Sequence, residues 1–254
     1  MAKSSYIAKS RASLEALKSA NLLKSLNLTV LIYGEVGVGK KSLGRYIFED
    51  APMIDGASQE KLYKALELNE KLIITNFDRI KNFDKLKKIV EIYKNKIVAT
   101  TSKEINSKLE DDFFSLKIFI PPLKERPEDV KALSLNFLEE TKTLFGDLPK
   151  DLDIKSLNLD LSQNAHSLKR SIYKAYFLNI LAQEDILEIF ENLLYEKLED
   201  GYDYKKLIRL FEVPLIKSGF KMFGSQLSMS KAFGINRNTL RKKIKEYDLQ
   251  GVDR

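Results

Sequence analysis

The residues best suited to chemistry form one glycine-rich stretch, GEVGVGKKS, at positions 34–42. Its glycines let the backbone turn tightly and aim N–H groups at a phosphate, and Lys40 adds a positive charge for the terminal phosphates. An apolar run, LTVLIY, precedes the stretch and a helical pattern, KSLGRYIF, follows it, which is the context that a phosphate-binding loop needs. The nucleotide-binding residues predicted here are Gly34, Glu35, Val36, Gly37, Val38, Gly39, Lys40, Lys41 and Ser42.

The residue after the loop lysine is unusual. Lys41 occupies the position at which such loops usually carry Ser or Thr, whose hydroxyl helps to hold magnesium. The residue types therefore leave two interpretations open. The stretch either binds a nucleotide, with or without magnesium, or it is a glycine turn that only joins a strand to a helix.

The elements around the loop alternate between strand and helix. The runs LTVLIY, KLIITNF and NKIVATT are apolar and rich in β-branched residues, as in buried parallel strands, and NFDKLKKIVEIYKN between the last two has a helical period. An amphipathic helix is expected near residues 14–26. After KIFIPPL the patterns EDVKALSLNFLEETKTLF and AHSLKRSIYKAYFLNILA are helical. We predict an α/β parallel-sheet subdomain at 1–122, including a leading helix within 1–27, and a helical lid at 123–183.

The C-terminal end has a second chemical signature. All of the excess positive charge of the chain, +7, falls in residues 201–254, and a localised basic surface indicates a polyanionic partner. The stretch SQLSMSKAFGINRNTLRKKIKEYDL predicts a short helix, a turn at Gly234 and a second helix capped by Asn236. This is a helix-turn-helix pattern, so we predict an all-α DNA-binding domain at 204–254, joined to the lid by a linker helix at 184–203.

Composition limits the other classes of protein. Cysteine is absent and His166 is the single histidine, so disulfides and a Cys/His zinc site are excluded. No apolar run approaches the roughly 20 residues that a membrane span needs, and the N-terminal residues lack the apolar core of a signal peptide. We expect a cytoplasmic chain with no membrane partner and no structural metal.

Three segments together go beyond a generic phosphate loop. GEVGVGKK, IPPLKERPEDV and GINRNTLRKKIKEYDL resemble the bacterial enhancer-binding proteins, the NtrC-like sigma-54 activator family. The resemblance covers most of the chain from about Leu28 onward. It implies an AAA+ P-loop domain that binds ATP or ADP, a helical lid and a C-terminal Fis-type helix-turn-helix. The residues then expected to contact DNA are Asn236, Arg237, Asn238, Thr239, Arg241, Lys242 and Lys245, with Arg237 first and Arg241 second for base contacts.

The sequence departs from this family at its catalytic positions. Thr75 and Asn76 stand where the family has an Asp-Glu pair, and neither side chain is a carboxylate base. No arginine lies between Arg79 and Arg126, the region of the family's arginine fingers, and His166 aligns with its lid arginine. The long insertion with the GAFTGA loop that touches sigma-54 is also missing. We predict a degenerate member with no assigned catalytic residue.

The leading hypothesis is a sequence-specific regulator of transcription that binds double-stranded DNA. Its AAA+ domain would bind ATP with weak or no hydrolysis, and it would not remodel sigma-54 polymerase by the usual loop. RNA polymerase or a regulatory protein is a further expected partner. A homodimer is expected through the C-terminal helices, packed by Leu210, Val213, Leu215, Ile216 and Phe220.

Two alternatives stay open at this point. One is an active ATPase that acts on DNA or on a protein, with Asp78 as the base and Lys103 or Lys108 as the cation. The other is an architectural DNA-binding protein with an inert AAA+ body. Whether the chain is an enzyme is therefore undecided from the sequence, and the missing acids weigh against it.

Overall fold

The computed structural model describes residues 6–26, 28–103, 112–146 and 157–249. The chain folds into two compact units, residues 1–180 (unit 1) and 181–254 (unit 2). Unit 1 holds the predicted α/β subdomain and most of the predicted lid. Unit 2 holds the predicted linker helix and C-terminal domain, together with residues 181–183, which the sequence assigned to the lid.

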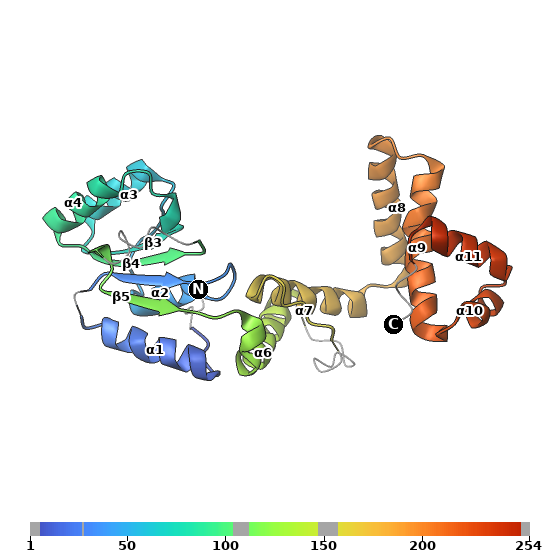
Figure 1. Cartoon of the computed structure of the whole chain (residues 1–254), viewed down its shortest axis with the longest axis horizontal. Coiled ribbons are helices and arrows are strands. Elements are labelled where there is room, and N and C mark those ends of the chain that lie inside the picture. Colours follow the sequence, from blue (N-terminus) through green and yellow to red (C-terminus); the bar gives the residue numbers. More distant parts are fainter. Residues whose placement is uncertain (1–5, 27, 104–111, 147–156, 250–254) are drawn as a thin grey trace. The chain divides into compact units, whose positions relative to one another are not determined.

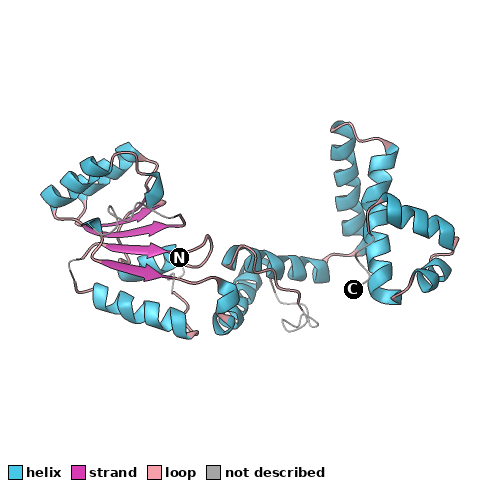
Figure 2. Ribbon diagram, in the orientation of Figure 1, coloured by secondary structure: helices cyan, strands magenta, loops and turns pink. Residues whose placement is uncertain are grey.

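A parallel sheet forms the centre of unit 1 (Figure 2). Its strands run in the spatial order β2-β3-β4-β1-β5, and every neighbouring pair is parallel. The carboxyl ends of the strands therefore meet at one edge, where ligands bind in open α/β sheets. This confirms the predicted α/β class. The strands are β1 (Val30–Tyr33), β2 (Met53–Asp55), β3 (Lys71–Thr75), β4 (Lys96–Thr101) and β5 (Leu116–Phe119).

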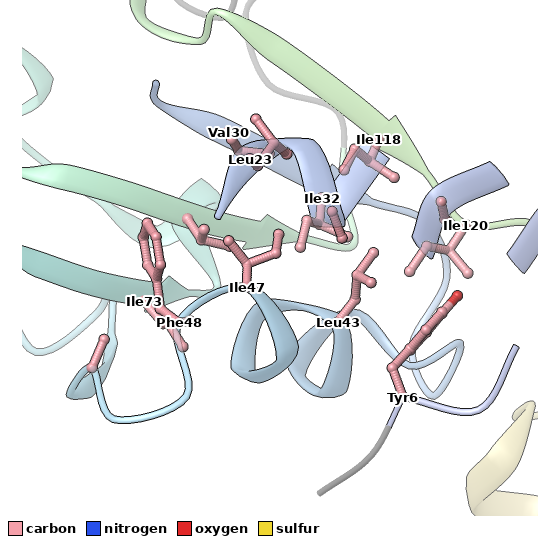
Figure 3. Packing of buried hydrophobic residues seen from close by; sticks show 14 of the residues in the cluster. Tyr6, Leu23, Val30, Ile32, Leu43, Ile47, Phe48, Ile73, Ile118 and Ile120 are labelled. Atoms are coloured by element: carbon pink, nitrogen blue, oxygen red, sulfur yellow. The ribbon is translucent and has the colours of Figure 1, made fainter. Parts of the chain in front are cut away.

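Helices cover both faces of this sheet (Figure 1). On one face, α1 (Arg11–Leu23) and α2 (Lys40–Ile47) bury their apolar side chains against β1, β4 and β5. Leu43 and Ile47 of α2 lie against Ile32 of β1 in this core (Figure 3). On the other face, α3 (Gln59–Leu68) and α4 (Phe83–Tyr93) pack with a second apolar cluster. Because both faces are buried, the central strands are apolar along their length.

The lid subdomain is a small helical body. It consists of the turn η2 (Leu123–Glu125), α6 (Pro127–Phe145) and α7 (Ala165–Ile180), close to the helices predicted. Proline at the first position of α6 suits a helix start, because its missing N–H would have had no partner there. The lid has its own core, formed by Leu123, Leu138, Leu168 and Ile172.

Four helices make up the described part of unit 2. They are α8 (Gln183–Glu199), α9 (Tyr204–Phe223), α10 (Gln226–Ala232) and α11 (Arg237–Glu246). Helix α11 begins where the sequence predicted, because the Asn236 side chain accepts a hydrogen bond from the Asn238 backbone N–H at 2.8 Å. The core of this unit contains Ile216, Phe220, Met229, Leu240 and Ile244.

Residues beyond α11 complete the core of unit 2. Tyr247 and Leu249 are buried in it, whereas Ala232 at the end of α10 and Ile235 in the turn that follows are exposed. Among the described residues, no helix is both long and apolar enough to span a membrane.

Candidate functional site

The glycine-rich loop joins β1 to α2 at the carboxyl edge of the sheet. Gly39 caps α2 without a side chain, so the first N–H groups of the helix stay free to point at an anion. Gly34 has φ +141°, and a Cβ there would lie 2.3 Å from the backbone oxygen of Ile120. Only glycine fits so close an approach, which explains its position at the end of β1.

The side chain of Lys40 folds back against this loop. Its ammonium donates hydrogen bonds to the backbone oxygens of Gly34 at 2.8 Å and Glu35 at 2.5 Å, and to the Ser102 hydroxyl at 2.9 Å. Burial, with a contribution from the charge of Lys41, lowers the pKa of Lys40 to about 8. Ser102 follows β4, so this hydrogen bond joins the predicted loop lysine to the carboxyl end of the neighbouring strand.

The lid contacts the loop directly through Asn164. This residue is buried and has φ +54°, a left-handed conformation that Asn tolerates better than most residues. Its amide nitrogen donates to the Glu35 carboxylate at 3.0 Å and to the Val36 backbone oxygen at 2.9 Å. Its amide oxygen accepts from the Leu123 N–H at 2.6 Å. Sequence reasoning considered His166 and missed Asn164, although an Asn before a helical pattern is a usable signal.

A second link from the lid runs through Arg126 and Asp129. The Arg126 guanidinium is 2% exposed; it donates to the Val38 backbone oxygen at 3.0 Å and pairs with Asp129 at 3.3 Å. Asp129 also accepts from the N–H groups of Lys9 at 2.6 Å and Ser10 at 2.9 Å, and from the hydroxyls of Ser10 and Ser13. The N-terminal segment, the lid and the loop are thereby joined.

These hydrogen bonds set the charge state of Asp129. Burial alone raises the pKa of its carboxyl, but the hydrogen bonds from Ser13, Ser10 and Lys9 outweigh burial, and the net result is a lowered pKa. Asp129 is therefore an anion at neutral pH, and it balances the buried charge of Arg126.

A cavity of about 750 Å³ opens beside the loop, between the N-terminal segment and the lid. Tyr6 and Ile7 line it on one side, and Phe137 and Lys169 of the lid line it on another. Its volume is within the range of small-molecule and cofactor pockets. Because Gly37, Val38, Gly39 and Ser42 also line it, the cavity continues into the phosphate loop.

The carboxyl ends of β2 and β3 carry a group of polar residues. Thr75 is buried, and Asn76, with φ +51°, donates to the Asp55 carboxylate at 2.6 Å. Asp78 accepts a hydrogen bond from the Thr101 hydroxyl at 3.0 Å. Sequence reasoning noticed Asp78 but missed Asp55, because the three residues of β2 give too short a pattern to recognise.

Helix α11 presents its basic side chains to solvent. Leu240 and Ile244 face the core, whereas the residues predicted to contact DNA lie on the exposed surface of α11 and its cap. Lys243 of the same helix is not part of this surface, because it pairs with Glu212 of α9 at 2.6 Å. The exposed set is Asn236, Arg237, Asn238, Thr239, Arg241, Lys242 and Lys245.

Two of the five dimer residues expected on α9 face inward. Ile216 and Phe220 are buried in the core of their own unit, so they are not available to a second copy, whereas Leu215 is 39% exposed. The larger uncovered apolar surface is on α8, which has no buried residue in its whole length. Leu187 and Ile189 of α8 are 57% and 56% exposed. Among the described residues, α8 therefore offers an uncovered apolar surface to a second copy, whereas Ile216 and Phe220 of α9 do not.

Comparisons with known proteins agree with this fold. The protein-family models searched do not match the chain. It is 23% identical over 300 residues to a protein named limonene hydroxylase from Geobacillus stearothermophilus, covering 92% of this chain and 54% of that protein. It is 25% identical over 202 residues to the DNA-binding transcriptional regulator NtrC of Bradyrhizobium sp., covering 61% of this chain and 42% of NtrC. The chain thus spans about half the length of the curated relatives it matches.

Among solved structures, NtrX from Brucella abortus in complex with ATP superposes with a TM-score of 0.57 at 14% identity, covering 95% of this chain and 69% of NtrX. The parallel five-stranded sheet with its helices is the AAA+ α/β fold. The chain is similar in sequence to NtrC-type regulators and shares its fold with NtrX.

Proposed function

We propose that this chain is a nucleotide-binding regulator of transcription that recognises a specific DNA sequence, with ATP or ADP bound at residues 34–42 and hydrolysis slow or absent. The observation that carries the proposal is the arrangement of Lys40. Its ammonium lies between the loop carbonyls and Ser102, and its neighbour Gly39 lines the cavity that lid residues also line. The similarity to NtrC, and the ATP in the NtrX structure, support the same assignment.

The proposal gives each part of the nucleotide a place. Phosphates would lie over the start of α2, where free N–H groups and the Lys40 charge meet. The base and ribose would occupy the cavity between Tyr6 and Phe137, whose rings offer apolar surface. Magnesium, if it accompanies the phosphates, would lack the loop hydroxyl that usually helps to hold it, because Lys41 stands at that position.

Calorimetric titration of the full chain with ATP tests the nucleotide site. Lys40→Ala removes the charge that faces the phosphates and should weaken ATP binding by about tenfold to a hundredfold, the worth of a hydrogen bond to a charged group. Lys61→Ala, which removes an exposed charge from α3, outside the proposed nucleotide site, is the matched control and should change affinity much less. Equal effects of the two substitutions would remove the basis of the proposal.

Nucleotide affinity should also depend on pH. Because the pKa of Lys40 is about 8 rather than 10.5, the free protein loses this charge as pH rises above 8. ATP affinity should therefore fall roughly tenfold between about pH 7.5 and about pH 9. In Lys40→Arg the side chain keeps its charge throughout this pH range, so the ATP affinity of that variant should not change with pH. An equal fall in both proteins would mean that another group titrates.

DNA binding is proposed for the exposed face of α11. Arg237 lies at the start of this helix, where residues of a recognition helix meet base edges in the major groove. Once a preferred duplex has been selected from a random pool, Arg237→Ala should weaken binding to it by about 1–3 kcal/mol and relax its sequence preference. Lys242→Ala should weaken binding to all duplexes by the same factor and should make the affinity less dependent on salt concentration. A variant at Arg237 that binds every duplex as the unaltered chain does would contradict this role.

A homodimer through the C-terminal helices completes the proposal. The uncovered apolar side chains of α8 supply the contact surface, in place of the buried residues of α9. Light scattering should find a dimer, and Leu187→Gln should weaken it more than Glu188→Gln on the same helix. A monomer at all concentrations tested would refute this part.

A further inference from the structure

The position of Asp78 is fixed by the fold. Asn76 adopts a left-handed conformation directly after β3, which turns the chain into the short helix η1 (Phe77–Arg79). Phe77 is 3% exposed and packs against the rings of Phe113 and Phe114. Because Phe77 is anchored in the core, its neighbour Asp78 is held at the carboxyl edge of the sheet, next to the end of β4.

Two consecutive residues of the chain connect Asp78 to the loop lysine. One carboxylate oxygen of Asp78 accepts a hydrogen bond from Thr101 at 3.0 Å. The next residue, Ser102, accepts a hydrogen bond from the Lys40 ammonium at 2.9 Å. The negative charge of Asp78 also acts on Lys40, because it opposes the lowering of the lysine pKa. Within the described residues, the second oxygen of Asp78 has no hydrogen bond or ion pair.

Two other acids near the loop are held by hydrogen bonds that direct them away from Lys40. Asp55 lies at the end of the edge strand β2, and its two oxygens accept from the Ala57 N–H at 2.9 Å and from Asn76 at 2.6 Å. Strands β3 and β4 separate it from the loop strand β1. One oxygen of Glu35 accepts a hydrogen bond from Asn164, which directs this carboxylate toward the lid. Among the described residues, Asp78 is the carboxylate that is hydrogen-bonded to the end of β4, next to Ser102 and Lys40, and one of its oxygens has no hydrogen bond.

We propose that Asp78 is the general base for slow hydrolysis of a nucleoside triphosphate bound at the loop. In this step the free oxygen of Asp78 accepts a proton from a water molecule. The water oxygen forms a bond to the terminal phosphorus, and the bond from that phosphorus to the bridging oxygen of the diphosphate breaks. The products are a nucleoside diphosphate and inorganic phosphate, and the proton passes from Asp78 to solvent. Lys40 and Ser102 orient the terminal phosphate.

This inference rests on the proposed nucleotide site, so its test measures binding and turnover separately. Phosphate release at saturating ATP and magnesium would be followed for the full chain, for Asp78→Asn and for Asp55→Asn, with calorimetric ATP titration of each preparation. We expect slow release by the unaltered chain, and at least a hundredfold less from Asp78→Asn, the lower end of what a general base contributes. ATP affinity should be retained in Asp78→Asn, and Asp55→Asn should keep most of the turnover.

Each contrary result has a distinct meaning. ATP binding without any phosphate release, or equal release from Asp78→Asn, would overturn the role of Asp78 while leaving the nucleotide site intact. Loss of release in Asp55→Asn alone would assign the base to β2 and also overturn the proposal. Failure of the unaltered chain to bind ATP would remove both the nucleotide site and the base.

Discussion

Replacing Asp129 with alanine should destabilise unit 1 by about 3–5 kcal/mol, the range measured when one partner of a buried ion pair is removed. The substitution leaves the Arg126 guanidinium, which is 2% exposed, without its counter-charge. It also removes the acceptor of the Lys9 and Ser10 N–H groups at the start of α1. Urea unfolding of the full chain, followed by a signal from unit 1, measures the loss.

The neighbouring residue provides the matched control. Glu128 is also an acid in the first turn of α6 but is exposed, so Glu128→Ala should cost well under about 1 kcal/mol. A loss at Asp129 no larger than the loss at Glu128 would mean that the buried network contributes nothing to folding.

The stabilising effect of Asp129 should depend on pH in a defined direction. Its carboxyl has a lowered pKa in the folded chain, so the folded state holds its proton less tightly than the unfolded state does. The stabilisation is therefore fully present above the ordinary Asp pKa of about 3.9 and is lost as pH falls through the lower folded value. The difference in stability between the unaltered chain and Asp129→Ala should shrink at strongly acidic pH.

The central elements of unit 1 could be predicted from sequence because their signals are local. Strands β1, β3 and β4 are continuous apolar runs, and each lies where those runs predicted. Strand β2 escaped prediction because it has three half-buried residues at the sheet edge. Helix α1 runs over Arg11–Leu23 rather than residues 14–26, because Ser10 caps it. That cap depends on Asp129, which is far away in the sequence.

The candidate site also contains residues that a local sequence pattern indicates and residues that only the fold brings together. The phosphate loop is a contiguous pattern, so its residues could be proposed from sequence. Asn164, Arg126 and Tyr6 reach the loop or its cavity only through the approach of segments distant in the chain, and no local pattern indicates such contacts. Ile216 and Phe220 were assigned to a dimer surface because periodicity shows which face of a helix is apolar, but not what covers it.

Gly37 lies close to the lid, so Gly37→Ala should have a large effect on both folding and binding. Its φ of +83° is costly for alanine, by about 1–2 kcal/mol. A Cβ there would also lie 2.5 Å from the Gln163 backbone oxygen and 2.6 Å from the His166 ring. Backbone cannot yield as a flexible side chain does, so the lid must move away from the loop. We expect a total destabilisation of about 3 kcal/mol or more.

Substitutions at two other glycines separate the effect of backbone strain from the effect of the clash with the lid. Gly44 lies inside α2, and Gly44→Ala places a methyl group 3.4 Å from Val98 of β4, which is an ordinary contact. This substitution should be neutral, or should stabilise the protein by up to about 1 kcal/mol through helix propensity. Gly39 has φ +105°, so Gly39→Ala introduces backbone strain. The added Cβ would lie 3.4 Å from the Tyr6 ring, an ordinary contact, and so would not clash with the lid.

Urea unfolding and ATP titration of the three variants form one experiment. If the lid closes the nucleotide cavity, Gly37→Ala should lose affinity for ATP by more than the strain-only variant Gly39→Ala, because it displaces Asn164 and Ala165 from the loop carbonyls. Equal losses of affinity in these two variants would show that loop conformation alone governs binding, and that the contacts between lid and loop serve only the stability of unit 1.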